Sequence, residues 1–170
     1  MEWDEATIIR QRFNDTIDTW INAIHDYTLE QLHQPPKPGS WSLGQVYMHI
    51  ISDTSWFVEQ IQAALQSNEH HDKDMHEDAK TMFRNNAFPD MKIEGPATNT
   101  FIPQPESKEV LQDRLTKIKN DVNRFDFKQR NGKTQHPGLL FFNALEWLQF
   151  AEMHMRHHFR QKKRIDELIS

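Results

Sequence analysis

The sequence predicts an all-α fold, an antiparallel four-helix bundle that forms a single domain over residues 1–170. Apolar residues recur at intervals of three and four in four separate stretches, which is the pattern of amphipathic helices. No stretch of any length shows the alternation that is typical of a β-strand. A chain of 170 residues is also long enough to bury one core, into which four such helices can pack.

The first two predicted helices cover residues 4–33 and 42–67, and they are separated by the proline-rich stretch "HQPPKPGS". Ser42 is the expected N-cap of the second helix, and Gln45, three residues later, completes a capping box. The apolar stripe of the first helix consists of Ile9, Phe13, Ile17, Trp20, Ile24 and Tyr27. The inner face of the second helix carries Val46, His49, Ile50, Asp53, Phe57, Gln60, Ile61 and Ala64.

A long connection, residues 68–105, separates the second helix from the third, and such a length is unusual in a compact domain. Within it, "KTMFRNNAF" is a candidate short helix. The third helix covers residues 107–125, with Val110, Leu111, Leu115, Ile118, Val122 and Phe125 as its stripe. The last helix covers residues 143–168 and begins with a capping box of Asn143 and Glu146. Its predicted inner face carries Trp147, Phe150, Ala151, His154, His158, Gln161, Ile165 and Leu168.

The composition excludes several classes of protein. Lysine and arginine total 20 and aspartate and glutamate 25, a net charge of −5 without a basic stripe, so no nucleic-acid partner is expected. The absence of cysteine excludes disulfides, thiolate metal sites and a cysteine nucleophile. No apolar run reaches the roughly 20 residues that span a bilayer, and the charged N-terminal segment does not resemble a signal peptide. We therefore expect a soluble cytoplasmic protein with no membrane partner.

Three histidines on two predicted helices form a candidate metal site. His154 and His158 lie four residues apart, so a helix places both on one face, here the inner one, whereas His157 is expected at the surface. His49 lies on the inner face of the second helix. Three imidazoles suit zinc, nickel, copper or iron and leave one coordination position open for water or substrate. Asp53, one turn after His49, is either a partner that orients a ligand or an ordinary surface carboxylate.

Two other interpretations of the histidines stay open at this point. The inward histidines can also be hydrogen-bonded core residues without a metal, because an HxxxH pair alone is weak evidence for ligands. A third inward histidine strengthens the metal interpretation, since burying imidazoles without compensation costs desolvation energy. A rival tract of polar residues is predicted to be a solvated loop, because nothing preorganises its donors; it consists of His70, His71, Asp72, Asp74 and His76.

Motifs along the whole chain resemble the DinB/YfiT-like family. "KPGSWSLGQVYMHI" resembles the proline-rich loop and second-helix start of that family, "IEGPATNTFIPQP" its linker before the third helix, and "HPGLLFFNALEWLQFAEMHMRHHFRQ" its C-terminal block. The resemblance implies a four-helix bundle with a divalent metal held by three histidines, which map onto His49, His154 and His158, often in a homodimer. Some relatives transfer low-molecular-weight thiols to electrophiles or isomerise thiol adducts.

These observations lead to three hypotheses, in order of preference. The first is a metal-dependent enzyme, a thiol S-transferase or hydrolase, in which zinc or nickel activates a thiol or water against a small-molecule substrate. The segment 68–105 would then line or cover the open coordination position. The second is a non-catalytic, stress-related metal-binding interaction protein, and the third is a bundle whose histidines bind no metal. Trp3 and Trp56 are candidates for a homodimer contact or for partly buried core.

Overall fold

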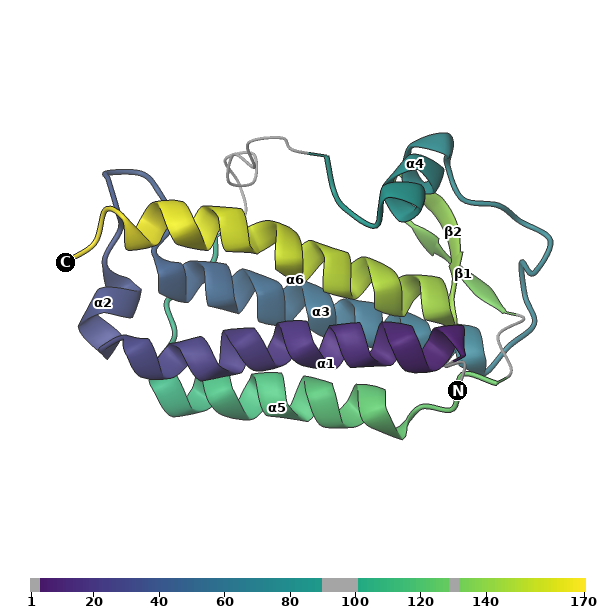
Figure 1. The fold of residues 1–170 in the computed structure, drawn as a ribbon, viewed down its shortest axis with the longest axis horizontal. Coiled ribbons are helices and arrows are strands. Elements are labelled where there is room, and N and C mark those ends of the chain that lie inside the picture. Colours follow the sequence, from purple (N-terminus) through teal and green to yellow (C-terminus); the bar gives the residue numbers. More distant parts are fainter. Residues whose placement is uncertain (1–3, 90–100, 129–131) are drawn as a thin grey trace.

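The computed structural model describes residues 4–89, 101–128 and 132–170, in which four long helices form a bundle (Figure 1). These helices are α1 (Glu5–Ala23), α3 (Leu43–Leu65), α5 (Lys108–Arg124) and α6 (Ala144–Asp166). Helices α1 and α6 run in one direction and α3 and α5 in the other, as the sequence colours in Figure 1 show. The predicted all-α bundle with a long connection between its second and third long helices is confirmed. No helix in the described ranges is long and apolar enough to cross a membrane.

The prediction of one continuous helix over residues 4–33 is wrong. The chain forms α1, then a short 3₁₀ turn, η1 (Ile24–Asp26), and then the separate helix α2 (Leu29–His33). The break occurs at Tyr27, whose backbone is extended, and Thr28 begins α2 with a capping box to Gln31. A capping box provides a new helix start even where the apolar spacing continues, so the spacing alone does not reveal the break.

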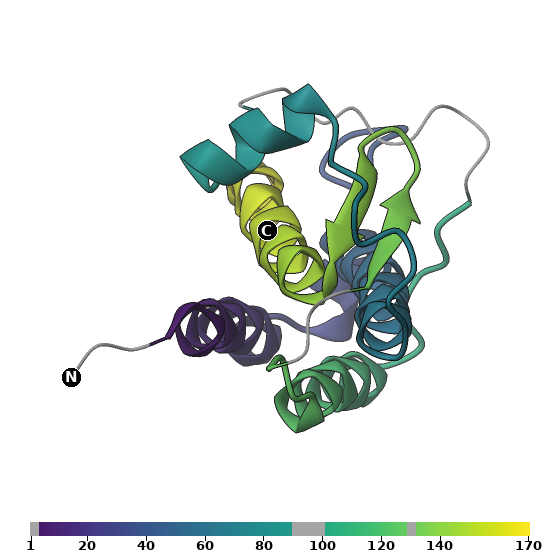
Figure 2. The same cartoon turned by 90° about the vertical axis from the view of Figure 1, so that its right-hand side faces the viewer.

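The prediction that no strand occurs is also wrong. Strands β1 (Lys133–His136) and β2 (Leu140–Asn143) form an antiparallel hairpin, with Thr134 opposite Phe142. Each strand has only four residues, which is too few for alternation to be detected in the sequence. The hairpin lies beside one end of α3 and α6, near α4 (Glu77–Asn85), which overlaps the predicted short helix but begins three residues earlier (Figure 2).

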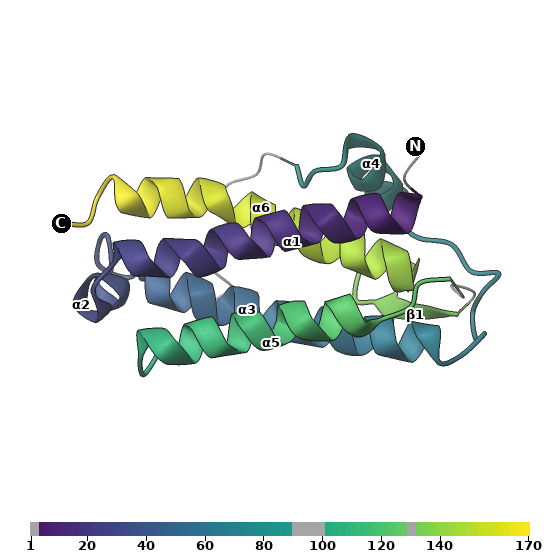
Figure 3. The same cartoon turned by 60° about the horizontal axis from the view of Figure 1, so that its bottom comes forward.

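Trp20 of α1 is fully buried in the core and bonds to both α3 and α6. Its indole nitrogen donates to the backbone oxygen of Met155, 3.1 Å away, and its own backbone oxygen accepts from the hydroxyl of Tyr47 at 2.7 Å. These two bonds link α1 to α6 and to α3. Helix α5 packs against α1 and α3, on the side of the bundle opposite α6 (Figure 3).

Two predicted helix starts are confirmed, whereas the predicted end of the last helix is not. The capping boxes of Ser42 with Gln45 and of Asn143 with Glu146 are both present. Leu168, in contrast, was predicted on the inner face of the last helix but is 60% exposed. Helix α6 ends at Asp166, two residues before Leu168.

Candidate metal centre

Three imidazoles from α3 and α6 converge inside the bundle. One ligand nitrogen from each of His49, His154 and His158 lies within 4.8 Å of the other two. The Nε2 atoms of His154 and His158 are 3.2 Å apart, and the ring of His49 lies 5.3 Å and 4.9 Å from their ring centres. Among the residues that the structure describes, no other group of three potential ligands meets in this way. The structure therefore brings together the three histidines that the sequence singled out.

The local environment keeps these imidazoles neutral. His158 is 1% exposed, and its burial lowers its pKa to about 4. Burial also lowers the pKa of His154 well below its usual range, and the neighbouring histidines add to that effect. The pKa of His49 is lowered by burial too, although the Asp53 carboxylate opposes the change. A neutral imidazole presents a free lone pair, which is the form that binds a metal.

Gln161 fixes the orientation of one imidazole. Its Oε1 lies 2.9 Å from Nδ1 of His158, so the amide oxygen accepts a hydrogen bond from Nδ1–H and leaves the Nε2 lone pair directed at the site. Sequence reasoning placed Gln161 on the inner face but gave it no role. Its spacing of three residues from His158 was the signal, since that spacing puts both side chains on one side of a helix. Nδ1 of His154 is buried and has no hydrogen-bond partner among the described residues.

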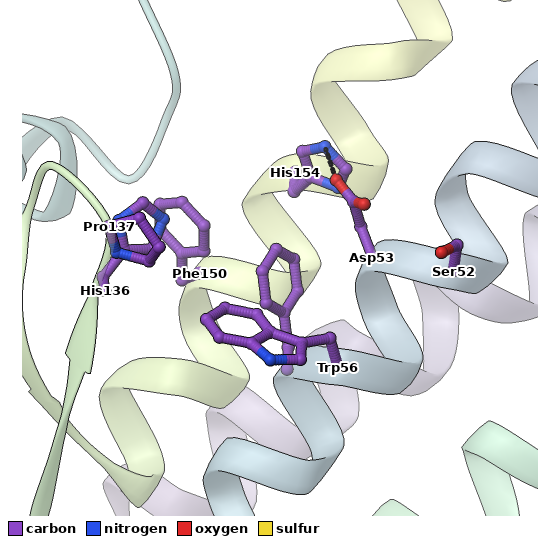
Figure 4. A pocket seen from close by; sticks show the side chains of 8 residues that line it. Ser52, Asp53, Trp56, His136, Pro137, Phe150 and His154 are labelled. Atoms are coloured by element: carbon purple, nitrogen blue, oxygen red, sulfur yellow. Dashed lines mark ion pairs between the residues drawn. The ribbon is translucent and has the colours of Figure 1, made fainter. Parts of the chain in front are cut away.

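Asp53 faces two of the three imidazoles. Its Oδ2 lies 3.5 Å from Nε2 of His49 and 3.6 Å from Nε2 of His154, an approach that Figure 4 shows for His154. The side chain is 40% exposed, so the carboxylate stands at the border between the histidine cluster and solvent. Partial burial raises its pKa, and the neighbouring His49 works in the opposite direction. The Asp53 carboxylate is therefore close enough to contact a group that binds at the histidine cluster.

The prediction that His157 lies at the surface is wrong, because it is only 7% exposed. The chain segment that follows α4 covers this side of α6. The ring of Phe88 lies 5.2 Å from that of His157 and 5.8 Å from that of His154. The predicted connection 68–105 therefore does reach the histidine cluster, at Phe88; residues 90–100 lie outside the described part of the chain.

A buried polar network, which sequence reasoning missed, joins this segment to α6. Glu152 is 3% exposed and accepts from the hydroxyl of Thr16 at 2.8 Å and from the guanidinium of Arg156 at 2.9 Å. Arg156 also donates to the backbone oxygen of Asn86, which ends α4 in a left-handed conformation. These bonds connect α1 and α6 to the residues just before Phe88.

None of the remaining candidates that the structure describes joins the group of three histidines. The rival tract around His70 and His71 is exposed, as predicted for a solvated loop, except that its neighbour Met75 is partly buried. Trp3 lies outside the described residues. Trp56 is partly buried, with its ring centre 5.4 Å from that of Trp147, which agrees with the alternative that it belongs to the periphery of the core.

A cavity of about 470 Å³ opens beside the histidine cluster. His154 and Asp53 stand on one side of it, and His136 and Pro137 of the hairpin on the other, with Trp56 and further aromatic rings between them (Figure 4). The hairpin and the cavity are features that the sequence did not predict. Together they place a space for a small molecule directly beside one of the candidate ligands.

Comparisons with known proteins agree with this architecture. The family model described as "DinB superfamily" matches residues 12–161. One similar solved structure is TT2238, described as a four-helix bundle protein, with a TM-score of 0.55 and 16% identity over 96% of this chain and 99% of that one. Another is YfiT from Bacillus subtilis, described as a probable metal-dependent hydrolase with an unusual four-helix bundle topology; its TM-score is 0.59 and its identity 15%, over 98% and 89% of the two chains. No curated protein gives a significant sequence match.

Proposed function

We propose that this chain, which belongs to the DinB superfamily, is a metal-dependent enzyme that acts on a small molecule, as a hydrolase or as a thiol S-transferase. The observation that carries the proposal is the convergence of three neutral histidine nitrogens within 4.8 Å beside a cavity. The description of YfiT as a probable metal-dependent hydrolase supports the proposal of a metal-dependent enzyme.

His49, His154 and His158 would hold the ion, with one nitrogen each. All three donors are imidazoles, which suit zinc or nickel, and three protein ligands leave a position for a reactant, as catalytic sites do. A divalent ion bound there would supply Lewis acidity, which lowers the pKa of a water or thiol that reaches it. Gln161 would keep Nδ1 of His158 protonated, so that Nε2 stays available as a donor.

Asp53 would orient the attacking water or thiol and receive its proton. Its Oδ2 lies 3.5 Å and 3.6 Å from two of the candidate ligand nitrogens, and its side chain lines the cavity. Partial burial raises the pKa of this carboxyl, which makes the carboxylate a stronger base than an exposed aspartate. We therefore propose that Asp53 acts directly on the reacting atoms and does not have only a structural role.

A catalytic site must be accessible, and this requirement separates the enzyme from a protein in which the ion only joins two helices. The cobalt-substituted protein should show a visible spectrum that changes on addition of thiocyanate or 2-mercaptoethanol. An unchanged spectrum would favour the non-catalytic metal-binding interaction protein.

Activity is then tested with two general reactions: hydrolysis of p-nitrophenyl acetate, and transfer of 2-mercaptoethanol to 1-chloro-2,4-dinitrobenzene. We expect one of them to depend on added zinc or nickel and to be lost in His154→Ala. Activity that survives both chelation and this substitution would overturn the proposal.

We propose three further properties. The chain would be a single domain and would act in the cytoplasm, as its length and composition predict, and it would assemble as a homodimer, as the family resemblance implies. Sedimentation velocity of the purified protein tests the last of these, with a species of twice the chain mass as the expected result and a monomer as the contrary one.

A further inference from the structure

The cavity beside the histidine cluster has aromatic walls. The ring of Phe57 stands edge-on to His154, with centres 5.6 Å apart, and edge-on to Phe150 at 5.3 Å. Phe150 in turn meets the ring of His136 at 5.0 Å. Flat rings therefore line the cavity without a break from the histidine cluster to the hairpin. Trp56 also lines the cavity, and Figure 4 shows its indole beside these rings.

The same cavity lacks a positive charge among the residues that the structure describes around it. Its lining contains no lysine and no arginine, and its one carboxylate is Asp53. Burial lowers the pKa of His136, so this ring is neutral near pH 7. An anionic group placed against the aromatic walls, away from the histidine cluster, would lose its hydration without gaining a cationic side chain as partner, which is unfavourable.

The cavity has a buried inner surface and exposed residues at its edge. Phe57 and Phe150, which form its inner surface, are 5% and 4% exposed, whereas Ser52 and Pro137 at its mouth are exposed. A flat apolar group can therefore enter at the mouth and cover the buried rings. Such stacking removes apolar surface from water and adds the preferred edge and face contacts of aromatic groups.

We propose that this cavity binds an uncharged, flat apolar portion of the substrate, such as an aromatic ring, and excludes a carboxylate from the same position. The inference rests on the proposed function only in that the reacting atom of the substrate would lie at the histidine cluster. In a thiol transfer the cavity would hold the apolar electrophile, and in a hydrolysis the apolar side of the scissile bond. A polyanionic thiol would not fit against these walls.

The first test uses chelator-treated protein, so that its outcome does not depend on a bound metal. Benzyl alcohol and benzoate have nearly the same size and differ in charge. We expect benzyl alcohol to shift the indole NMR signal of Trp56 in a saturable way and to bind about tenfold more tightly than benzoate. Equal binding of the two probes, or binding of neither, would overturn the proposal.

Two variants and one control locate the site. Followed through the ligand's own NMR signals, Trp56→Ala should weaken benzyl alcohol binding about tenfold. Phe101→Ala, which removes an aromatic ring that is 85% exposed and outside the cavity, should not. Should Trp56→Ala fail to fold, Ser52→Lys provides the second readout at an exposed position. It adds a cation at the mouth and should raise the affinity for benzoate about tenfold. No change in Ser52→Lys would contradict the proposed position of the ligand.

A second test connects the cavity to the cluster. In zinc-loaded protein, benzohydroxamate and acetohydroxamate carry the same metal-binding group and differ in the apolar part. Benzohydroxamate should bind about tenfold more tightly, and Trp56→Ala should remove that difference. Equal affinity of the two for the wild type would refute the aromatic site while leaving the metal site intact. Binding of neither, with benzyl alcohol still bound, would refute the metal site alone.

Discussion

The Nε2 atoms of His154 and His158 lie 3.2 Å apart on successive turns of α6. Two nitrogens at that distance are held either by one shared proton or by one shared ion. Two ligands of a tetrahedral zinc, each about 2.0–2.1 Å from the ion, are themselves about 3.3 Å apart. The observed separation therefore already fits a common metal.

Gln161 should strengthen metal binding without contacting the ion. Gln161→Ala removes the acceptor for Nδ1 of His158, so the ring loses its fixed orientation and protonation. We expect the dissociation constant for zinc to rise about 10- to 100-fold, as is typical when an outer partner of a ligand is lost. Competition with a chromophoric chelator measures it. Gln161→Glu keeps an acceptor and serves as the matched control; equal affinity in all three proteins would show that this hydrogen bond has no part in the site.

The metal-free protein should lose stability on acidification from about pH 6.5 to about pH 4. His158 has a pKa of about 4 when folded and about 6.5 when unfolded, so between these values the unfolded chain binds a proton that the folded chain does not. The contribution is fully present above pH 6.5 and is lost as the pH falls, by an amount on the order of 3 kcal/mol.

Urea denaturation of chelator-treated protein at several pH values between 7 and 4 measures this dependence. His158→Phe should reduce the slope, since it removes the group that protonates. His71→Gln, in the exposed loop, should leave the slope unchanged. A stability that stays flat over this range would contradict the burial of neutral histidines.

Asp53 should affect turnover more than metal content. Asp53→Asn removes the proton acceptor but leaves all three imidazoles, so we expect unchanged metal stoichiometry and a loss of activity of about 100-fold or more. Elemental analysis and kinetics on the same preparation test both parts. Loss of the metal would instead identify Asp53 as a ligand, and full activity would remove it from the reaction.

Arg156 should hold the residues around α4 in place. Arg156→Ala breaks its bonds to Glu152 and to the backbone oxygen of Asn86. Amide exchange over residues 77–88 should become at least about tenfold faster, because that segment has fewer bonds to the bundle. Hydrogen exchange read by mass spectrometry tests this. Arg164→Ala, at an exposed position of the same helix, is the matched control. Equal protection of residues 77–88 in both variants would show that other contacts hold this segment against the bundle.

Periodicity and capping predicted the four long helices and the placement of the three histidines. His49, His154 and His158 lie at positions where a helix turns them inward, so the helical repeat alone brings them to the core. The break at Tyr27 was missed because a capping box at Thr28 overrides a continuous apolar stripe.

Features that depend on contacts between distant segments could not be predicted. His157 is buried by Phe88, about 70 residues away in the chain, and no local pattern reveals that neighbour. The hairpin at residues 133–143 consists of two strands too short to show alternation, yet it provides one side of the cavity. The turn between its strands contains Gly138, which has a positive φ.

The most direct test of the metal site is elemental analysis of the purified, untagged protein beside its His49→Ala variant. His49 is the ligand contributed by α3, so its loss leaves only a pair on one helix. We predict about one zinc or nickel per chain in the wild type and essentially none in a folded variant. No stoichiometric metal in the wild type, even after reconstitution, or an unchanged content in the variant, would contradict the three-histidine site.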